Sequence, residues 1–435
     1  MEYGCIGEKL PHSFSKTIHE KLGPATYDLI ELKPKEVAPF LSQKQFRAIN
    51  VTIPYKQTVI PYLDYISETA HGIGAVNTIV NHGGKLFGYN TDFYGMMTLI
   101  EKLRLAIAGK KVLILGTGGT AKTAAAVCTA LSADQILKVS RTPSEEDISY
   151  QQACDEHADA QIVINTTPVG MFPHTDASPL DLTRFSHLEG ALDAVYNPLV
   201  TRFVQAAQKQ DAKAEGGLYM LIAQAVKAYE IFNGVSLPKE TLDRVYGQIL
   251  GEKQNIVLTG MPGSGKSTLG KILSKRTGRP FFDTDNEIVK AAGKRIPQIF
   301  EEDGEAHFRE LETQTIRALS ARSGVIIATG GGAVLRDENI DLLKQNGRIY
   351  FRDRPLRYLL PTESRPLAAS REAIEARYRE RIGTYRRTAD EIIFTENNLN
   401  GAAFEIERRH FGEDTGHKRT ESESARTSGT GDLRK

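Results

Sequence analysis

The sequence predicts an α/β protein with two nucleotide-binding units, each built on a parallel sheet. Two glycine-rich turns carry this prediction, at residues 116–119 and 260–265. Each turn follows an apolar run typical of a buried parallel strand and precedes a helical pattern, an order that forms phosphate sites in α/β folds. Because the two turns lie far apart in the sequence, we expect two domains rather than one.

Length and composition agree with this prediction. At roughly 100–200 residues per domain, 435 residues allow two to four domains. Lys and Arg number 55 against 54 Asp and Glu, and this near-neutral charge does not favour a nucleic-acid partner. No apolar run approaches about 18 residues and no signal-peptide pattern opens the chain, so we expect no membrane partner. Three scattered cysteines, Cys5, Cys128 and Cys154, favour a cytoplasmic location.

The remaining elements follow in order along the chain. Strands are expected at 27–32, 48–53, 111–115, 135–139, 161–165 and 255–259. Helices are expected at 92–104, 120–131, 219–233, 239–250 and 267–276. The polar stretch 251–254 predicts a break between the two halves. Residues 412–435 have almost no large apolar side chains, so we expect a disordered tail.

The first glycine-rich turn fits the dinucleotide pattern G-x-G-x-x-[GA]. Its residues are Gly116, Gly118, Gly119, Thr120 and Ala121. The flanking strand and helix strengthen a motif that is weak as a string alone. The next strand ends in Ser140, Arg141 and Thr142 with no acidic residue for a ribose 2′-hydroxyl, and Arg141 can pair with a 2′-phosphate, so NADP(H) is favoured over NAD. The alternative is that Arg141 is only a solvated strand-end residue, and the nearby Glu145 and Glu146 weaken an anion site.

The second turn fits the P-loop pattern G-x-x-x-x-G-K-[ST], which is a specific signal. Its backbone amides would cradle phosphates, Lys266 would reach the β- and γ-phosphates, and the Ser267 hydroxyl would ligate Mg²⁺. The nucleotide-binding residues expected here are Gly263, Ser264, Gly265, Lys266, Ser267 and Thr268.

Four polar segments precede the first turn. They read H-S-x-S at 12–15, N-V-T-x-P-x-K at 50–56, G-A-V-N-T at 74–78 and G-x-N-T-D at 88–92. Taken singly they are ordinary, since Lys56 could be a surface lysine and Asp92 a helix N-cap. Together and in this order they resemble the shikimate dehydrogenase family, and the resemblance continues at 165–171, 193–198 and 216–224. It covers roughly residues 1–248.

This resemblance implies a two-lobed dehydrogenase. A substrate lobe of residues 1–100, completed by 216–248, would face a Rossmann-type NADP lobe of residues 101–215. The resemblance implies that Lys56 and Asp92 are the catalytic pair, which moves a proton on the substrate oxygen. It also implies that Gly217 lies near the nicotinamide. The substrate-binding residues that it implies are Ser13, Ser15, Thr52, Asn77, Asp92, Tyr196 and Gln224.

Residues 254–411 resemble shikimate kinase, a P-loop α/β domain with a parallel sheet. After the P-loop the resemblance rests on D-T-D at 283–285, F-R-E-L-E at 308–312, GGG at 330–332 and R-P-L at 365–367. It implies that Asp283 supports Mg²⁺, that Asp285 contacts the shikimate hydroxyls, and that Arg365 stabilises the transferring phosphoryl group.

The resemblance also implies a carboxylate site in the kinase. Arg309 and Arg381 would hold the shikimate carboxylate through their planar guanidinium groups, and Gly331 would let the backbone approach the ring. The family pattern R-x-P-L-Y has glycine at position 383 here, which predicts a looser turn after Arg381.

The combined prediction is a bifunctional enzyme that reduces 3-dehydroshikimate to shikimate with NADPH and then phosphorylates shikimate with ATP and Mg²⁺. A homodimer is left open. One alternative makes the first half a non-catalytic domain, which the intact Lys56 and Asp92 disfavour. A second is a quinate-type dehydrogenase using NAD, weakly disfavoured by Arg141 and Ser13. A third is a P-loop NTPase doing mechanical or nucleic-acid work, disfavoured by the near-neutral charge and the carboxylate-binding arginines.

Overall fold

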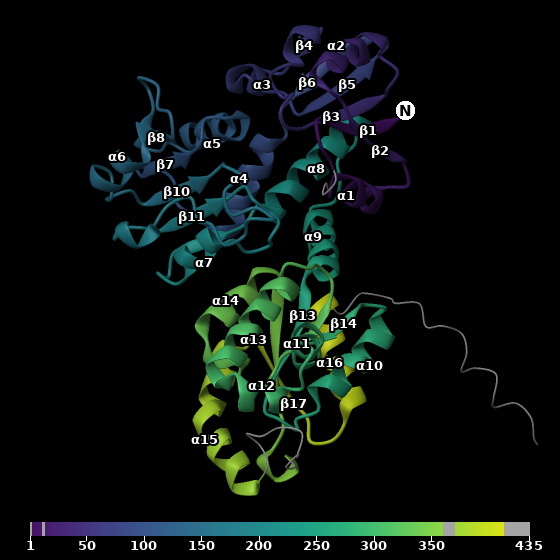
Figure 1. Cartoon of the computed structure of the whole chain (residues 1–435). Helices are drawn as coiled ribbons and strands as arrows, with labels where there is room; N and C mark the ends of the chain where they lie inside the picture. Colours follow the sequence, from purple (N-terminus) through teal and green to yellow (C-terminus); the bar gives the residue numbers. More distant parts are fainter. Residues whose placement is uncertain (1, 11–13, 360–369, 413–435) are drawn as a thin grey trace, which may run out of the picture.

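The computed structural model describes residues 2–10, 14–359 and 370–412, and the described residues form three sheets (Figure 1). The strands of each sheet come from one continuous stretch, before residue 90, within 111–215 and within 255–394. The predicted α/β class with parallel sheets is confirmed. The predicted tail, 412–435, lies outside the described residues except for Gly412.

The first sheet is mixed and carries the polar motifs. β3 runs parallel to β1 and antiparallel to β5, and β5 runs antiparallel to β6. β1 and β3 are buried along their whole length. Its strands lie in the order β2 (Tyr27–Glu31), β1 (Tyr3–Gly7), β3 (Ala48–Val51), β5 (Thr78–His82), β6 (Lys85–Tyr89) and β4 (Tyr65–Ile66). Its helices are α1 (Ser15–Leu22), α2 (Pro34–Gln43) and α3 (Glu68–Ile73), with the 3₁₀ turn η1 (Ile60–Tyr62).

The second sheet is parallel throughout. Its order is β12 (Lys213–Glu215), β11 (Gly190–Asp193), β10 (Ile162–Asn165), β7 (Lys111–Leu115), β8 (Gln135–Ser140) and β9 (Ile148–Ser149). The chain reverses its direction across the sheet between β7 and β10. Ligands of such sheets bind beyond the carboxyl ends of the strands at this reversal. Gly116 lies there, directly after β7. Its helices are α5 (Gly119–Ala130), α6 (Tyr150–Asp155) and α7 (Arg202–Gln208), with η2 (Leu182–Arg184).

The third sheet is also parallel and has β13 at its centre. Its order is β14 (Phe281–Asp283), β15 (Ile326–Ala328), β13 (Asn255–Thr259), β16 (Gly347–Asp353) and β17 (Glu391–Phe394). Around it lie α10 (Lys266–Thr277), α11 (Thr284–Ala292), α12 (Ile296–Glu302), α13 (Gly304–Ser320), α14 (Asp337–Asn346), α15 (Arg371–Thr388) and α16 (Leu399–Phe411), with η3 (Ala333–Leu335) and η4 (Leu356–Tyr358).

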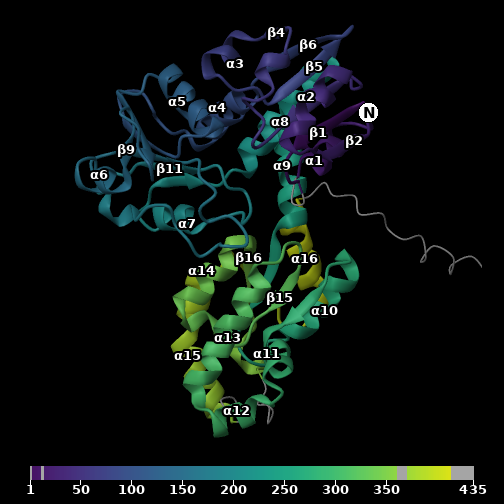
Figure 2. The same cartoon turned by 45° about the horizontal axis from the view of Figure 1, so that its top comes forward.

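Three long helices connect these parts. α4 (Asp92–Leu103) and α8 (Leu218–Asn233) pack together through a shared apolar core that includes Met96, Leu99 and Ile222. α9 (Glu240–Lys253) then leads to the third sheet (Figure 2). Because α8 returns the chain from the second sheet to the first, both lobes contribute to the space between them.

The polar stretch 251–254, where we expect the boundary between the halves, is not a break in secondary structure. Residues up to Lys253 belong to α9, and Gln254 alone separates the helix from β13. The helix continues because Gly251 is buried against His410 and Phe411 of α16, and because the Arg279 guanidinium donates hydrogen bonds to the carbonyls of Gly251 and Glu252 in its last turn.

Two further local predictions are corrected. Thr91, not Asp92, is the N-cap of α4, and the Asp92 side chain bonds to Lys56 instead of capping the helix. No turn follows Arg381, because Gly383 lies inside the continuous helix α15. Although glycine costs about 1 kcal/mol in a helix interior, the buried side chains of Arg381 and Tyr385 anchor α15 on either side of it.

Candidate active sites

Lys56 and Asp92 form an ion pair in the first half of the chain. The Lys56 Nζ lies 2.7 Å from the Asp92 Oδ2, and the side chains are only 15% and 10% exposed. Lys56 follows β3 by a short turn, whereas Asp92 is the first residue of α4. A nearly buried ammonium beside a carboxylate can donate a proton to a substrate oxygen and is held in place while it does so.

A cluster of buried amides and hydroxyls adjoins this pair. The Asn77 amide nitrogen donates to the Thr91 hydroxyl at 3.0 Å and to the Gln224 amide oxygen at 3.5 Å. The Thr91 backbone N–H donates to the Asn77 amide oxygen at 2.8 Å. The neighbouring residue, Val76, donates its backbone N–H to the Lys56 carbonyl. The structure thus brings the predicted Asn77, Asp92 and Gln224 together, and it adds Thr91, which the motif contains but sequence reasoning passed over.

The dinucleotide turn lies against the catalytic lysine. Gly116 has φ of +111°, and a Cβ there would lie 2.8 Å from the Thr166 hydroxyl, so a side chain is excluded. A Cβ on Gly119 would lie 3.8 Å from Lys56 Cδ. Gly119 is the first residue of α5, so a helix N-terminus, which favours anions, follows the turn directly. The predicted nucleotide turn and the predicted proton donor therefore share one space, although they belong to different lobes.

Arg141 lies at the expected strand end. Val139 pairs with the strand that precedes Gly116, so Ser140, Arg141 and Thr142 emerge at the same sheet edge as the turn. Arg141 is exposed and has no ion pair among the described residues. Of the nearby acidic residues, Asp147 and Glu146 pair with Lys138, at 3.3 Å and 4.0 Å. This leaves a cation available for an anionic 2′ group.

Tyr196 and Gly217 lie on neighbouring backbone segments between the two lobes. The Tyr196 ring packs against Phe14, with 5.2 Å between centroids. The Gly217 N–H donates to the Val195 carbonyl at 2.8 Å, and a Cβ on Gly217 would collide with the Ala194 carbonyl. The segment starts at Asp193, whose carboxylate accepts from Asn165, Thr201 and the Val195 N–H. Burial raises the pKa of Asp193 to about 7, although these bonds oppose the shift.

Three predicted substrate residues of the first half remain to be placed. Thr52 follows β3, and its methyl group lies near Gly7 rather than among the amides. Ser15 is the first residue of α1. Ser13 lies outside the described residues.

The second half forms a P-loop between β13 and α10. Gly263 and Gly265 have φ of +77° and +88°, which only glycine adopts readily. The buried Lys266 ammonium donates to the Gly260 carbonyl at 2.7 Å and spans the loop. Ser264 is buried, and Thr268 is exposed in the first turn of α10. The loop therefore presents its amides and a helix N-terminus, the arrangement that binds nucleotide phosphates.

Ser267 and Asp283 are paired beside this loop. The Ser267 hydroxyl donates to the Asp283 carboxylate at 2.5 Å. A hydroxyl and a carboxylate are oxygen ligands of the kind that Mg²⁺ uses together with substrate phosphates. This pair of oxygen donors fits a magnesium ion that is shared with a nucleotide. Within the described residues there is no group of three His, Cys, Asp or Glu side chains that could hold a metal.

Charged side chains surround the triple-glycine turn 330–332. A Cβ on Gly330 would lie 2.7 Å from Glu312 Oε1 and 2.8 Å from Asp285 Oδ1, and one on Gly332 would collide with the Arg309 guanidinium. The buried Arg381 donates to the Gly331 carbonyl at 3.3 Å. The structure thus brings four predicted substrate residues together: Asp285, Arg309, Gly331 and Arg381.

Glu312 was missed by the sequence prediction. It is buried, and its carboxylate lies 2.8 Å from the Arg309 guanidinium. Burial raises the pKa of Glu312 even though Arg309 opposes this. The three-residue spacing of Arg309 and Glu312 on one helix was the available signal.

Arg352 and Arg354, at the end of β16, were also missed. Arg352 is 2% exposed and points at Gly265 of the P-loop, where a Cβ would collide with its guanidinium. Among the described residues it has no ion pair, and its Nε has no hydrogen-bond partner. Arg354 donates to the Gly263 carbonyl at 2.9 Å. Burial, and secondly Arg354, lowers the pKa of Arg352 to about 10. A buried cation without a counter-charge is costly unless an anion joins it.

Arg365 and the surrounding lid segment lie outside the described residues. No helix in the described ranges combines the length and apolar character needed to cross a bilayer.

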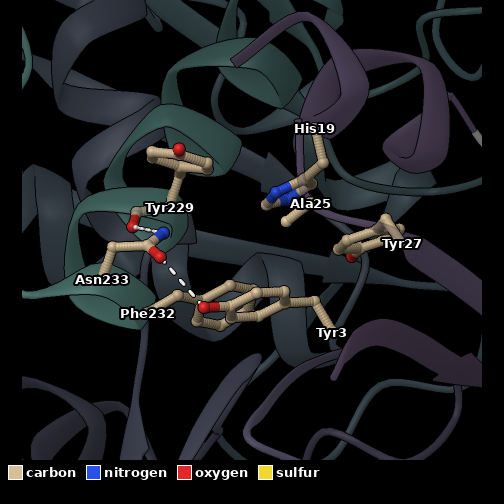
Figure 3. A pocket seen from close by; sticks show the side chains of 7 residues that line it. All are labelled: Tyr3, His19, Ala25, Tyr27, Tyr229, Phe232 and Asn233. Carbon is tan, nitrogen blue, oxygen red and sulfur yellow. Dashed lines mark hydrogen bonds between the residues drawn. The ribbon is translucent and has the colours of Figure 1, made fainter. Parts of the chain in front are cut away.

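A small aromatic pocket lies apart from both sites (Figure 3). The His19 ring stacks on Tyr27 with 4.1 Å between centroids, and the Tyr3 hydroxyl donates to Asn233. Its lining residues are Tyr3, His19, Ala25, Tyr27, Tyr229, Phe232 and Asn233. It holds no ion pair and no cluster of catalytic groups, so we assign it to the core.

Comparison with known proteins covers both halves. Residues 5–79 match the model of the shikimate dehydrogenase substrate binding domain, and residues 262–408 match that of shikimate kinase. The shikimate dehydrogenase (NADP(+)) of Clostridium perfringens is 37% identical over 265 residues, which cover 57% of this chain and 97% of that protein.

Solved structures agree over the first half. Shikimate dehydrogenase 1 from Peptoclostridium difficile is similar with a TM-score of 0.54 and 31% identity, over 57% of this chain and 98% of that one. Shikimate 5-dehydrogenase from Thermus thermophilus, in complex with NADP(H) and shikimate, is similar with a TM-score of 0.51 and 27% identity, over 57% and 98%.

Proposed function

This chain belongs to the shikimate dehydrogenase family and carries a shikimate kinase domain, and on that premise we propose how its own residues perform the two reactions. The dehydrogenase reduces 3-dehydroshikimate to shikimate with NADPH, and the kinase phosphorylates shikimate with ATP. The product of the first site is the substrate of the second.

The 2.7 Å contact of Lys56 with Asp92, beside the dinucleotide turn, carries the dehydrogenase assignment. NADPH supplies the hydride that reduces the carbonyl carbon. The Lys56 ammonium donates its proton to the carbonyl oxygen, and Asp92 holds that ammonium in place. Thr91, Asn77 and Gln224 bind the substrate hydroxyls as one hydrogen-bonded group. Arg141 pairs with the 2′-phosphate of the nucleotide.

Ser13, Ser15, Thr52, Tyr196 and Gly217 complete this site in the proposal. Hydroxyls at the first three positions suit a carboxylated, polyhydroxylated ring. Tyr196 and Gly217 close the nicotinamide side, supported by their position between the lobes.

In the kinase we propose that the P-loop amides, Lys266, Arg352 and Arg354 hold the ATP phosphates. Mg²⁺, bound beside Ser267 and Asp283, would neutralise phosphate charge. Asp285 orients the attacking shikimate hydroxyl, and Arg309 and Arg381 bind the carboxylate, with Glu312 holding Arg309 in place. Arg365 would stabilise the transferring group from the lid.

The domain limits follow the sheets. We propose residues 1–100 with 216–248 as the substrate lobe, 101–215 as the NADP lobe and 254–411 as the kinase, supported by the strand membership of each sheet. A cytoplasmic location is supported by three free cysteines, two of them buried. A homodimer stays a prediction that light scattering on the purified chain tests.

A coupled assay tests the proposal. The full chain is given 3-dehydroshikimate, NADPH and MgATP, and shikimate 3-phosphate is measured by mass spectrometry. We expect Lys56→Ala to stop product formation unless shikimate is added, and Lys266→Ala to stop it at shikimate. Product formation from 3-dehydroshikimate by Lys56→Ala would contradict the assignment, as would shikimate-independent ATP hydrolysis at the full rate.

A further inference from the structure

Helix α14 of the kinase lies against α7 of the dehydrogenase (Figures 1 and 2). The Asp341 carboxylate pairs with Lys209 at 2.7 Å and with Arg202 at 3.2 Å. The Asp341 carbonyl also accepts from the Gln205 amide at 2.7 Å. Ion pairs and a hydrogen bond thus hold one domain against the other.

The last turn of α14 reaches further, to the backbone that follows Tyr196. The Leu199 N–H donates to the Asn346 side-chain oxygen, and the Val200 N–H donates to the Gln345 carbonyl, both at 2.9 Å. The Gln345 amide donates to the Thr175 carbonyl at 2.8 Å. Gln345 and Asn346 are both 3% exposed. Because their partners are main-chain groups, these bonds hold the path of the dehydrogenase backbone.

That backbone forms one wall of the dehydrogenase site. A Cβ on Gly216 would lie 2.7 Å from the Leu199 carbonyl, so Leu199 and Gly216 are in close contact. Gly216 and Gly217 lead directly into α8, which carries Gln224. A displacement of Leu199 would therefore reach both Tyr196, three residues earlier, and the substrate amide.

The stand-alone dehydrogenase from Clostridium perfringens aligns over nearly its whole length with the first part of this chain and has no counterpart of α14. The bonds to Leu199, Val200 and Thr175 are therefore a feature that the kinase domain adds to this enzyme.

We propose that Gln345 and Asn346 are positioning residues for the dehydrogenase reaction, supplied by the kinase domain. They hold the Leu199–Val200 backbone and thereby set the placement of Tyr196 and Gly217. Asp341 fixes the helix that presents them. This inference rests on the proposed function of the dehydrogenase site.

The test compares Asn346→Ala, which removes the side-chain oxygen that binds the Leu199 N–H, and Asp341→Ala with the control Lys344→Ala in the full chain. Lys344 lies on the same helix but pairs with Asp390 of the kinase at 2.9 Å. We expect both test variants to raise the dehydrogenase KM for 3-dehydroshikimate or NADPH by about tenfold. The control should match the wild type, and the kinase KM for shikimate should stay unchanged throughout. Asp341→Glu, which keeps the charge, should restore most of the loss.

Dehydrogenase KM values of Asp341→Ala equal to those of the control would overturn the inference, and so would a lower Tm without a KM change. If Asn346→Ala fails to fold, the Asp341→Ala variant decides the question alone, because Asp341 is partly exposed. Failure of the proposed function looks different, since the wild-type chain would then not reduce 3-dehydroshikimate.

Discussion

The Lys56 ammonium lies 2.7 Å from the Asp92 carboxylate, although 36 residues separate them. β3 ends just before Lys56 and α4 starts at Asp92, so the two elements converge on one point between the lobes. Lys56 also lies close to the dinucleotide turn, since a Cβ on Gly119 would lie 3.8 Å from its Cδ. This arrangement supports the proposal that Lys56 transfers a proton.

We expect Lys56→Ala to lower the dehydrogenase kcat by about 10²- to 10⁴-fold, the range for losing a positioned acid. Asp92→Asn keeps the shape but removes the charge that orients Lys56, so it should lower kcat as well. NADPH oxidation measures both effects. Kinase activity of the same preparations is the control, and a Lys56→Ala variant with wild-type kcat would refute the role.

Arg141→Ala should raise the KM for NADPH by about tenfold, because a charge-assisted bond to the 2′-phosphate is lost. The KM for NADH, which lacks this phosphate, should change little. Arg184→Ala, which removes an exposed arginine paired with Asp155, serves as the control. An equal loss with both nucleotides would show that Arg141 does not read the phosphate.

Arg352→Met should weaken nucleotide binding without lowering the stability of the fold. Methionine is similar in length to arginine but removes a buried charge that has no ion pair among the described residues, so the Tm without ligand should stay the same or rise. The KM for ATP should increase by about tenfold because a contact to a phosphate is lost. Arg386→Met, which breaks an ion pair with Asp353, is the comparison. Unchanged ATP binding in Arg352→Met would show that Arg352 does not bind the nucleotide.

Asp193 should make stability fall as pH rises. Burial raises its pKa from 3.8 to about 7, so between these values the folded chain holds a proton that the unfolded chain has released. The contribution is greatest below pH 3.8 and is lost as pH rises to about 7. Asp193→Asn keeps an amide in place of the neutral acid and should flatten the dependence of the unfolding free energy on pH across this window. Denaturant titrations at several pH values test this, and an unchanged slope would count against it.

His19 should act in the opposite direction. Burial lowers its pKa from 6.5 to about 3, although a bond to Asn50 opposes the shift. Its contribution to stability is complete above pH 6.5 and is lost as pH falls toward 3. We expect His19→Phe, which preserves the aromatic stack with Tyr27, to lose less stability than the wild type between pH 7 and pH 4. If both chains lose the same stability at low pH in thermal melts, His19 does not cause the loss.

Local chemistry made much of this protein predictable. The two glycine turns require backbone angles and close approaches that few other residues allow, so Gly116 and Gly265 could be placed from the sequence. Lys56, Asp92 and Lys266 were identified because each belongs to a motif whose residue types and spacing match a specific chemistry.

Other features depend on packing between distant segments. The helix across residues 251–253 persists because α16 and Arg279 satisfy it, and no local pattern shows either partner. Arg352 reads as an ordinary strand-end arginine until β16 places it beside the P-loop.

The sequence by itself determined the two nucleotide motifs, the catalytic residue types and the families that they resemble, because these depend on short segments with fixed chemical requirements. Only the tertiary structure decided that Lys56 meets the dinucleotide turn, that Arg352 lies buried against the P-loop, and that Gln345 and Asn346 of the kinase bond to the dehydrogenase backbone. These contacts join residues far apart in the chain, and they exist only once the sheets and helices have packed.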